Sequence, residues 1–160
     1  QRGFCDSVAA CRVSTPLWCV PPTLAQHDRI VIFADFAACL IAFVVFYQVV
    51  LSVLAPWAGA AYGGRATSND GTLPTRYRVA SLVAAVVLSL ATWLILAAGS
   101  VIARGPVPGG VLTLVTWVLA GLFLLNTFGN LRARHPVERW GFSGITAGLA
   151  ALCVAIAVNR

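Results

Sequence analysis

Four long apolar segments, separated by short polar stretches, dominate the hydrophobic pattern of this chain. They run over residues 30–54, 79–103, 110–131 and 141–158. As helices rising about 1.5 Å per residue, the first three can cross a hydrocarbon core of about 30 Å, whereas the fourth is so short that it must stand upright or thin the bilayer. Short connections favour antiparallel neighbours. The pattern therefore predicts an all-α fold, a transmembrane bundle of four helices with up-down topology.

The first 29 residues differ from the rest of the chain. They contain no apolar run long enough to cross a membrane or to form the core of a signal peptide, and they hold Cys5, Cys11 and Cys19. We therefore predict two parts, a Cys-containing extramembrane N-terminal extension at 1–29 and a four-helix transmembrane domain at 30–160.

Composition supports the membrane class. Hydrophobic residues make up 59% of the chain, the mean hydropathy is +0.87, and only 10% of residues are charged, against about 25% in soluble domains. The net charge of +6 is divided among separate connections, so it forms no concentrated patch for nucleic acid. We expect membrane lipids as partners and no nucleic acid.

The arginines beside the spans predict an orientation. An even number of spans puts both termini on one side, with four of these arginines on that side and six on the other. Because positively charged connections are retained in the cytoplasm, we predict a multi-pass plasma-membrane protein with both termini outside. The four are Arg12, Arg29, Arg104 and Arg160, and the six are Arg65, Arg76, Arg78, Arg132, Arg134 and Arg139.

Small residues recur every four positions in two of the spans. Such spacing lets helix backbones approach closely where lipid removes the usual hydrophobic drive. We predict that these residues pack the four helices together, and a homodimer seam is the alternative. They are Ala34, Ala38 and Ala42 in the first span, and Gly144, Gly148, Ala147, Ala151 and Ala155 in the fourth.

Two further stretches form recognisable signatures. One comprises Ala55-Pro56-Trp57, Tyr62-Gly63-Gly64 and Leu73-Pro74-x-Arg76-x-Arg78, and the other comprises Asn126-Thr127-Phe128-Gly129-Asn130 and Glu138-Arg139. Together they resemble a family of small, uncharacterised four-span integral membrane proteins of actinobacteria and related bacteria. The resemblance implies a four-span fold in a bacterial plasma membrane, and it supplies neither a reaction nor a catalytic residue.

Polar side chains within the spans are the first candidates for a site. Asn126 and Asn130 are four apart, on one helix face, where their carboxamides suit a polar substrate or an ion, or else hydrogen bonds to neighbouring helices. Asp35 is the only ionisable side chain inside an apolar span, and it suits a proton carrier, a cation ligand or an interfacial partner of Arg29. Gln48 is thirteen residues from Asp35, a rotation of about 220°, so it lies on a different face.

The charged connection before the fourth span is the second candidate. Arg132, Arg134 and Arg139 suit a lipid headgroup or a phosphate-bearing substrate, and ordinary anchoring by positive charge explains the same residues. We list these three arginines with Asp35 and Gln48, and with the two asparagines above, as candidate binding residues.

Cysteine spacing allows one disulfide among Cys5, Cys11 and Cys19, with one thiol left over. These cysteines with His27 also make four zinc-binding groups, but their spacing matches no familiar ligand pattern. No metal and no other cofactor is therefore predicted.

The sequence holds no nucleophile–base pair, phosphate-binding glycine loop or His/Glu metal motif. We therefore predict a non-enzymatic membrane protein that binds lipid, a partner membrane protein or a second copy of itself. The alternative is a small dimeric transporter or channel for a polar solute or ion, using Asp35, Gln48, Asn126 and Asn130. A membrane enzyme acting on a lipid or quinone is a third reading.

Overall fold

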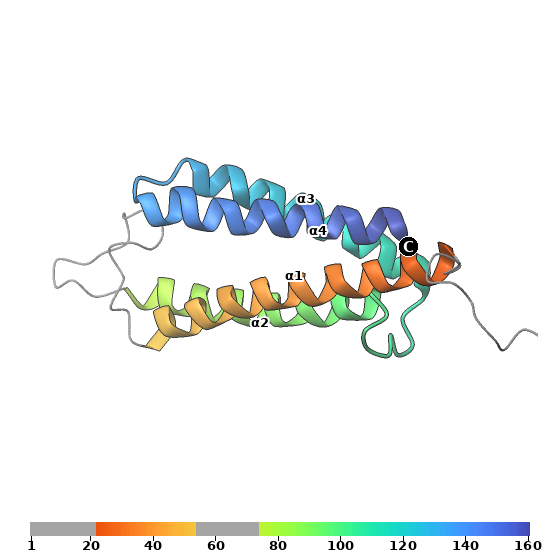
Figure 1. The fold of residues 1–160 in the computed structure, drawn as a ribbon. Helices are drawn as coiled ribbons and strands as arrows, with labels where there is room; N and C mark the ends of the chain where they lie inside the picture. Colours follow the sequence, from red (N-terminus) through yellow and green to blue (C-terminus); the bar gives the residue numbers. More distant parts are fainter. Residues whose placement is uncertain (1–21, 54–73) are drawn as a thin grey trace, which may run out of the picture.

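The computed structural model describes residues 22–53 and 74–160. Within these ranges the chain forms helices and no strand, and four helical segments are long and apolar enough to cross a membrane (Figure 1). The predicted fold class is confirmed. The elements are α1 (Pro22–Val53), α2 (Thr75–Ala98), α3 (Gly109–Leu131), the π-helix η3 (Val137–Phe142) and α4 (Ser143–Asn159).

Helix α1 begins inside the segment predicted to be an extension. Proline suits the first turn of a helix because its missing N–H would have no partner there, and α1 starts at Pro22. Its 32 residues reach about 48 Å, so the first turns, including the exposed residues 26–29, extend beyond a hydrocarbon core of about 30 Å. Several predictions fall outside the described residues. They concern the disulfide among Cys5, Cys11 and Cys19, the two arginines Arg12 and Arg65, and the part of the first signature that lies in residues 55–73.

Helix α2 ends five residues before the predicted limit of its span. Two hydrogen bonds close its last turn, from Val101 N to Leu96 O at 3.0 Å and from Ser100 N to Ala97 O at 3.3 Å. This is the Schellman arrangement, whose left-handed position is held here by Ser100 with φ of 60°.

We predict that Ser100→Gly stabilises the protein by about 1 kcal/mol, because a residue with a Cβ pays a steric cost in the left-handed region that glycine avoids. Denaturation in mild detergent with increasing dodecyl sulfate measures the difference. Ser89→Gly, inside α2, serves as the control and should be destabilising. A loss of stability in Ser100→Gly would show that the serine side chain itself contributes.

The fourth helical segment is longer than predicted. The π-helix η3 follows Pro136 directly and continues into α4, so the apolar helical segment runs over Val137–Asn159 for 23 residues. At about 34 Å this segment is long enough to cross a hydrocarbon core of about 30 Å without thinning it. Arg139 and Trp140 therefore lie in a helix and not in the connection before it.

The helices form two antiparallel pairs. Helix α1 packs chiefly on α2, and α3 packs chiefly on α4, with lesser contacts between α1 and α4 and between α2 and α3. The end of α1 is fixed to α2 by Arg78, whose Nη2 donates to Val53 O at 2.7 Å. Figure 1 shows that the pairs lie close where α4 ends and diverge towards the opposite end. We call these pairs the α1–α2 hairpin and the α3–α4 hairpin.

In α1 and α3 the buried side chains recur mostly in steps of three and four. In α1 they are Ile30, Ala34, Ala37, Ile41, Val44 and Leu51. This alternation averages 3.5 residues and keeps one stripe facing the neighbouring helices, as in left-handed helix bundles. We call the stripe of α1 its seam.

Only part of the predicted small-residue pattern lies in the packed interior. Ala34 is fully buried, Ala38 is half-buried and Ala42 is exposed, while Ala37 takes the next buried position. In α4, Gly144, Ala147 and Ala151 are exposed. Each step of four rotates a helix by about 400°, so the stripe drifts by about 40° per step away from the seam.

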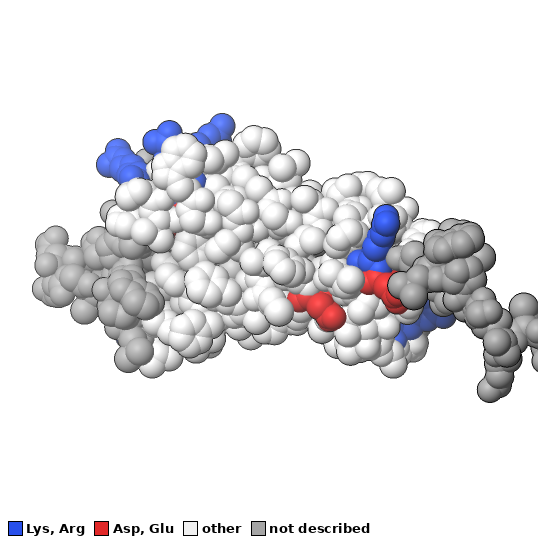
Figure 2. All heavy atoms as spheres, viewed as in Figure 1, with Lys and Arg blue, Asp and Glu red and all other residues white. Residues whose placement is uncertain are grey.

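The outer surface is apolar in its middle and charged towards its ends (Figure 2). Large hydrophobic side chains point outwards on all four helices; for example, Phe36 is 63% exposed and Leu125 is 68% exposed. In water such a surface would be costly, whereas lipid chains cover it without penalty. The architecture is that of a multi-pass membrane protein.

Candidate functional site

A pocket of about 540 Å³ lies at the end where the two hairpins diverge. It is lined by the last turns of α1 and α3, by the connection that follows α3, by η3 and by the start of α4. The pocket therefore lies at one end of the bundle. Its polar lining includes Tyr47, Gln48, Asn126, Asn130 and Thr146.

Gln48 is the most informative residue of this lining. It follows Ile41 and Val44 and precedes Leu51 in the seam of α1, where the pattern of steps would place an apolar side chain. Its Oε1 is shielded from solvent and has no hydrogen-bond partner among the described residues. A buried carboxamide left in this state costs about 1–3 kcal/mol, so the position favours a ligand or water as its partner.

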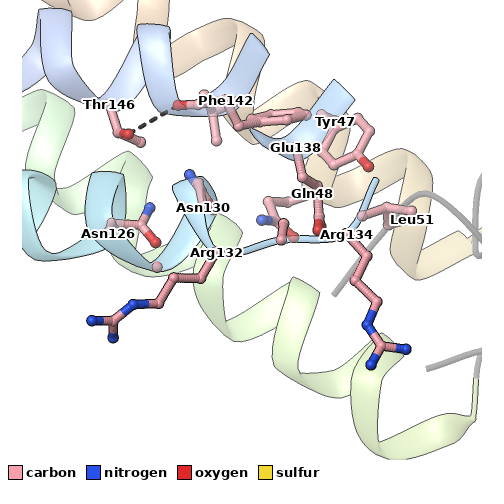
Figure 3. Close-up of a pocket in the computed structure, with 13 residues that line it drawn as sticks. Tyr47, Gln48, Leu51, Asn126, Asn130, Arg132, Arg134, Glu138, Phe142 and Thr146 are labelled. Atoms are coloured by element: carbon pink, nitrogen blue, oxygen red, sulfur yellow. Dashed lines mark hydrogen bonds between the residues drawn. The ribbon is translucent and has the colours of Figure 1, made fainter. Parts of the chain in front are cut away.

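Two further carboxamides line the pocket from α3. Asn126 and Asn130 are one turn apart, and their side chains form no hydrogen bond with any residue the structure describes. Figure 3 shows the Gln48 and Asn130 carboxamides pointing into the pocket. Three amide groups from two hairpins are thus available to a polar ligand.

The rim of the pocket carries charge. Arg132 is the C-cap of α3, Arg134 follows in the connection, and Glu138 belongs to η3. Figure 3 shows both arginines extending outwards from the rim. Neither guanidinium forms a hydrogen bond or ion pair within 22–53 and 74–160. Being exposed and long, both side chains are free to turn towards a ligand at the mouth.

The other walls are built from helix–helix contacts. The rings of Tyr47 and Phe142 lie 4.6 Å apart and tie α1 to η3. Thr127 and Thr146 share a hydrogen bond of 2.8 Å between their hydroxyl oxygens and tie α3 to α4. One turn further into the bundle Phe123 is buried, and the apolar core continues from there, so the pocket is closed on this side.

Two of the seven candidate residues lie elsewhere. Asp35 is exposed and about 20 Å from Gln48 along α1, at the level where Gly99 ends α2. Arg139 is exposed on η3, with its guanidinium 5.3 Å from the centre of the Trp140 ring. The structure brings together the other five, namely Gln48, Asn126, Asn130, Arg132 and Arg134.

Sequence reasoning did not select Tyr47, Phe142 or Thr146 for this site. Tyr47 and Phe142 resemble ordinary apolar span residues, and their ring contact depends on how α1 meets η3. Thr146 has the i−4 hydrogen bond to Phe142 O, at 2.9 Å, that is common for threonine in membrane helices. No local motif distinguishes these residues, since only the packing of the hairpins brings Phe142 and Thr146 to Tyr47 and Gln48.

A second hollow, of about 450 Å³, lies at the opposite end of the bundle, lined by Arg104, Arg160 and Ser100 among others. Burial, and to a lesser extent the nearby charge of Arg104, lower the pKa of Arg160. The hollow therefore gathers two positive charges, but it holds none of the candidate residues.

The comparisons add no relative to this geometry. No protein-family model, no curated protein and no solved structure matches the chain. Among the residues that the structure describes, no group of three or more His, Cys, Asp or Glu side chains is placed to hold a metal ion. The site has to be interpreted from its own chemistry.

Proposed function

We propose that this chain is a non-enzymatic integral membrane protein of a bacterial plasma membrane that binds an anionic phospholipid at the pocket between its hairpins. We also propose, from its two sequence signatures, that it belongs to the small four-span family of actinobacteria and related bacteria. One observation carries the binding proposal: two arginines without partners stand at the rim of a pocket whose carboxamides also lack partners, at one end of the bundle.

The chemistry of the lining fits a lipid better than a freely soluble ion. Val44, Leu51 and Phe142 give the pocket an apolar wall beside its polar one. A phospholipid carries both kinds of surface, and a charge-assisted hydrogen bond from an arginine to its phosphate contributes about 1.5–3 kcal/mol. The positive-inside rule assigns the arginine-bearing connections, and therefore this pocket, to the cytoplasmic leaflet, with both termini outside.

The geometry gives less support to transport. The transporter reading joined Asp35 to Gln48 and the two asparagines, but Asp35 is about 20 Å away along α1 and faces outwards. Between the two ends of the bundle the interior is filled by the apolar core, which includes Ile41, Leu149 and Ile156. We therefore favour binding at one membrane surface over passage through the bundle.

The test measures how strongly the protein retains short-chain phosphatidylglycerol and phosphatidylcholine, by native mass spectrometry. A neutral detergent is used, so that no charged bilayer surface contributes to binding. The double variant Arg132→Gln/Arg134→Gln should bind phosphatidylglycerol at least about tenfold more weakly, since it loses at least one charge-assisted hydrogen bond of about 1.5 kcal/mol to the phosphate. The single variant Arg139→Gln is the matched control, because this arginine is next to the site without lining it.

Binding by Arg139→Gln should equal that of the unaltered protein, and Arg132→Lys/Arg134→Lys should retain part of the affinity because its charge is kept. Equal retention of the two lipids, or equal losses in the Arg139 variant and the double variant, would contradict the proposal. Such a result would leave the arginines as general membrane anchors.

A further inference from the structure

We infer that the pocket selects a polyol phosphate ester, a phosphate diester or monoester that carries several hydroxyl groups, and not a phosphate alone. This inference rests on the proposed function, because it names the chemistry of the group bound at the same pocket. Its basis is the combination of three carboxamides and two arginines around one cavity.

The carboxamides define what the bound group has to offer. Each has an oxygen that accepts and an NH₂ group that donates, so a hydroxyl, which does both, matches either end of Gln48, Asn126 and Asn130. An ammonium group only donates hydrogen bonds, and a trimethylammonium group neither donates nor accepts them. Both groups are cationic and are also repelled by Arg132 and Arg134. Among headgroups, those bearing hydroxyls therefore suit this lining best.

A ligand with separate anionic and hydroxylated parts matches this lining. Its phosphate takes the arginine side of the rim, and its hydroxyls take the side of the carboxamides.

The placement of Gln48 separates these two parts. Gln48 is five residues before the end of α1, about 7.5 Å along the axis from its last residue, and its carboxamide points inwards, while the arginines extend outwards (Figure 3). A glycerol or inositol ester, which extends from a phosphate to hydroxyl groups, suits this division of the lining. The π-helix η3, which supplies Glu138 and Phe142, adds to the argument, because π-helical turns are frequent at functional sites.

Two sources supply this chemistry, a lipid headgroup and a water-soluble ester, and the experiment separates them. Native mass spectrometry in neutral detergent measures binding in two sets of ligands. In the lipid set, short-chain phosphatidylglycerol and phosphatidylinositol are compared with phosphatidic acid of the same chain length. In the soluble set, glycerol phosphate and inositol phosphate are compared with inorganic phosphate. We expect the hydroxylated member of each comparison to bind at least about fivefold more tightly, the effect of one additional hydrogen bond. Preference within the lipid set alone identifies a lipid site, and equal preference in both sets identifies a site for the soluble ester.

The variant Gln48→Leu should bind phosphatidylglycerol and phosphatidic acid about equally. Its affinity for phosphatidic acid itself should be unchanged. The variant should also fold, because leucine suits the apolar seam on either side of position 48. The matched control is Gln26→Leu, which makes the same change at the opposite end of the bundle, where Gln26 Nε2 donates to Asn159 O at 2.8 Å. It should leave the preference intact.

Failure of this inference is distinct from failure of the proposed function. If phosphatidic acid binds as tightly as phosphatidylglycerol, and Gln48→Leu changes neither, the polyol inference is overturned. Anionic-lipid binding stands in that case, provided that Arg132→Gln/Arg134→Gln weakens retention of both lipids. If the double arginine variant leaves all anionic ligands bound, the proposed function falls as well.

Discussion

Replacing Gly99 with leucine is expected to destabilise the bundle by about 3 kcal/mol, the upper part of the range for overpacked interiors. Gly99 is buried at the end of α2, and a Cβ added there would collide with the Cβ of Ala34 and approach Ile30 O at 3.5 Å. A leucine side chain fits only if α1 moves away from α2. The measurement is denaturation of the purified protein in mild detergent with increasing dodecyl sulfate.

The control is Gly121→Leu, in which the same substitution is made on α3. A Cβ at Gly121 meets no atom within 4 Å, so leucine should raise stability slightly by its better helix propensity. A double-mutant cycle sharpens the test: Ala34→Gly should restore much of the stability lost in Gly99→Ala, because it removes the atom that the new methyl group meets. Independent, additive effects would contradict a direct contact between these two residues.

Replacing Ile41 with alanine should cost about 3 kcal/mol, within the usual range for cavities in packed interiors. Ile41 is fully buried in the core cluster with Ile95, Leu149 and Ile156. The space left by its side chain is closed to lipid, so the neighbouring atoms lose contacts that nothing replaces. The same dodecyl sulfate denaturation reports the loss.

Ile32→Ala provides the comparison within the same helix. Ile32 is 60% exposed on the outer surface of α1, where lipid or detergent chains fill the vacated space. Its effect should stay within about 0.5 kcal/mol, as for most surface substitutions. A larger loss at position 32 than at position 41 would mean that α1 is rotated about its axis relative to the structure described above.

Hydropathy alone was sufficient to predict the number and order of the helices, because crossing lipid requires long apolar segments whatever their packing. The ends of the helices were harder to predict. At the end of α2, glycine is the residue usually found in the left-handed position, but here Ser100 holds that position and Gly99 precedes it. The close approach of Ala34 requires glycine at 99, a constraint that belongs to tertiary packing and leaves no local signature.

The candidate site shows the same division. The spacing of Asn126 and Asn130 indicated one helix face, and the structure places both on one pocket. That Gln48 meets them depends on how the α1–α2 hairpin docks against the α3–α4 hairpin, which hydropathy does not specify. Arg139 was grouped with its neighbours as part of a connection, but the helical segment starting after Pro136 turns it away from the pocket.

The two-hairpin construction also bears on biogenesis. Each hairpin pairs two spans that leave the ribosome one after the other, and each forms its main contacts within itself. The chain can therefore enter the bilayer as two successive helical pairs, with the weaker α1–α4 and α2–α3 contacts formed last. Since those late contacts create the pocket, any ligand that binds there would favour the assembled protein over its separately inserted halves.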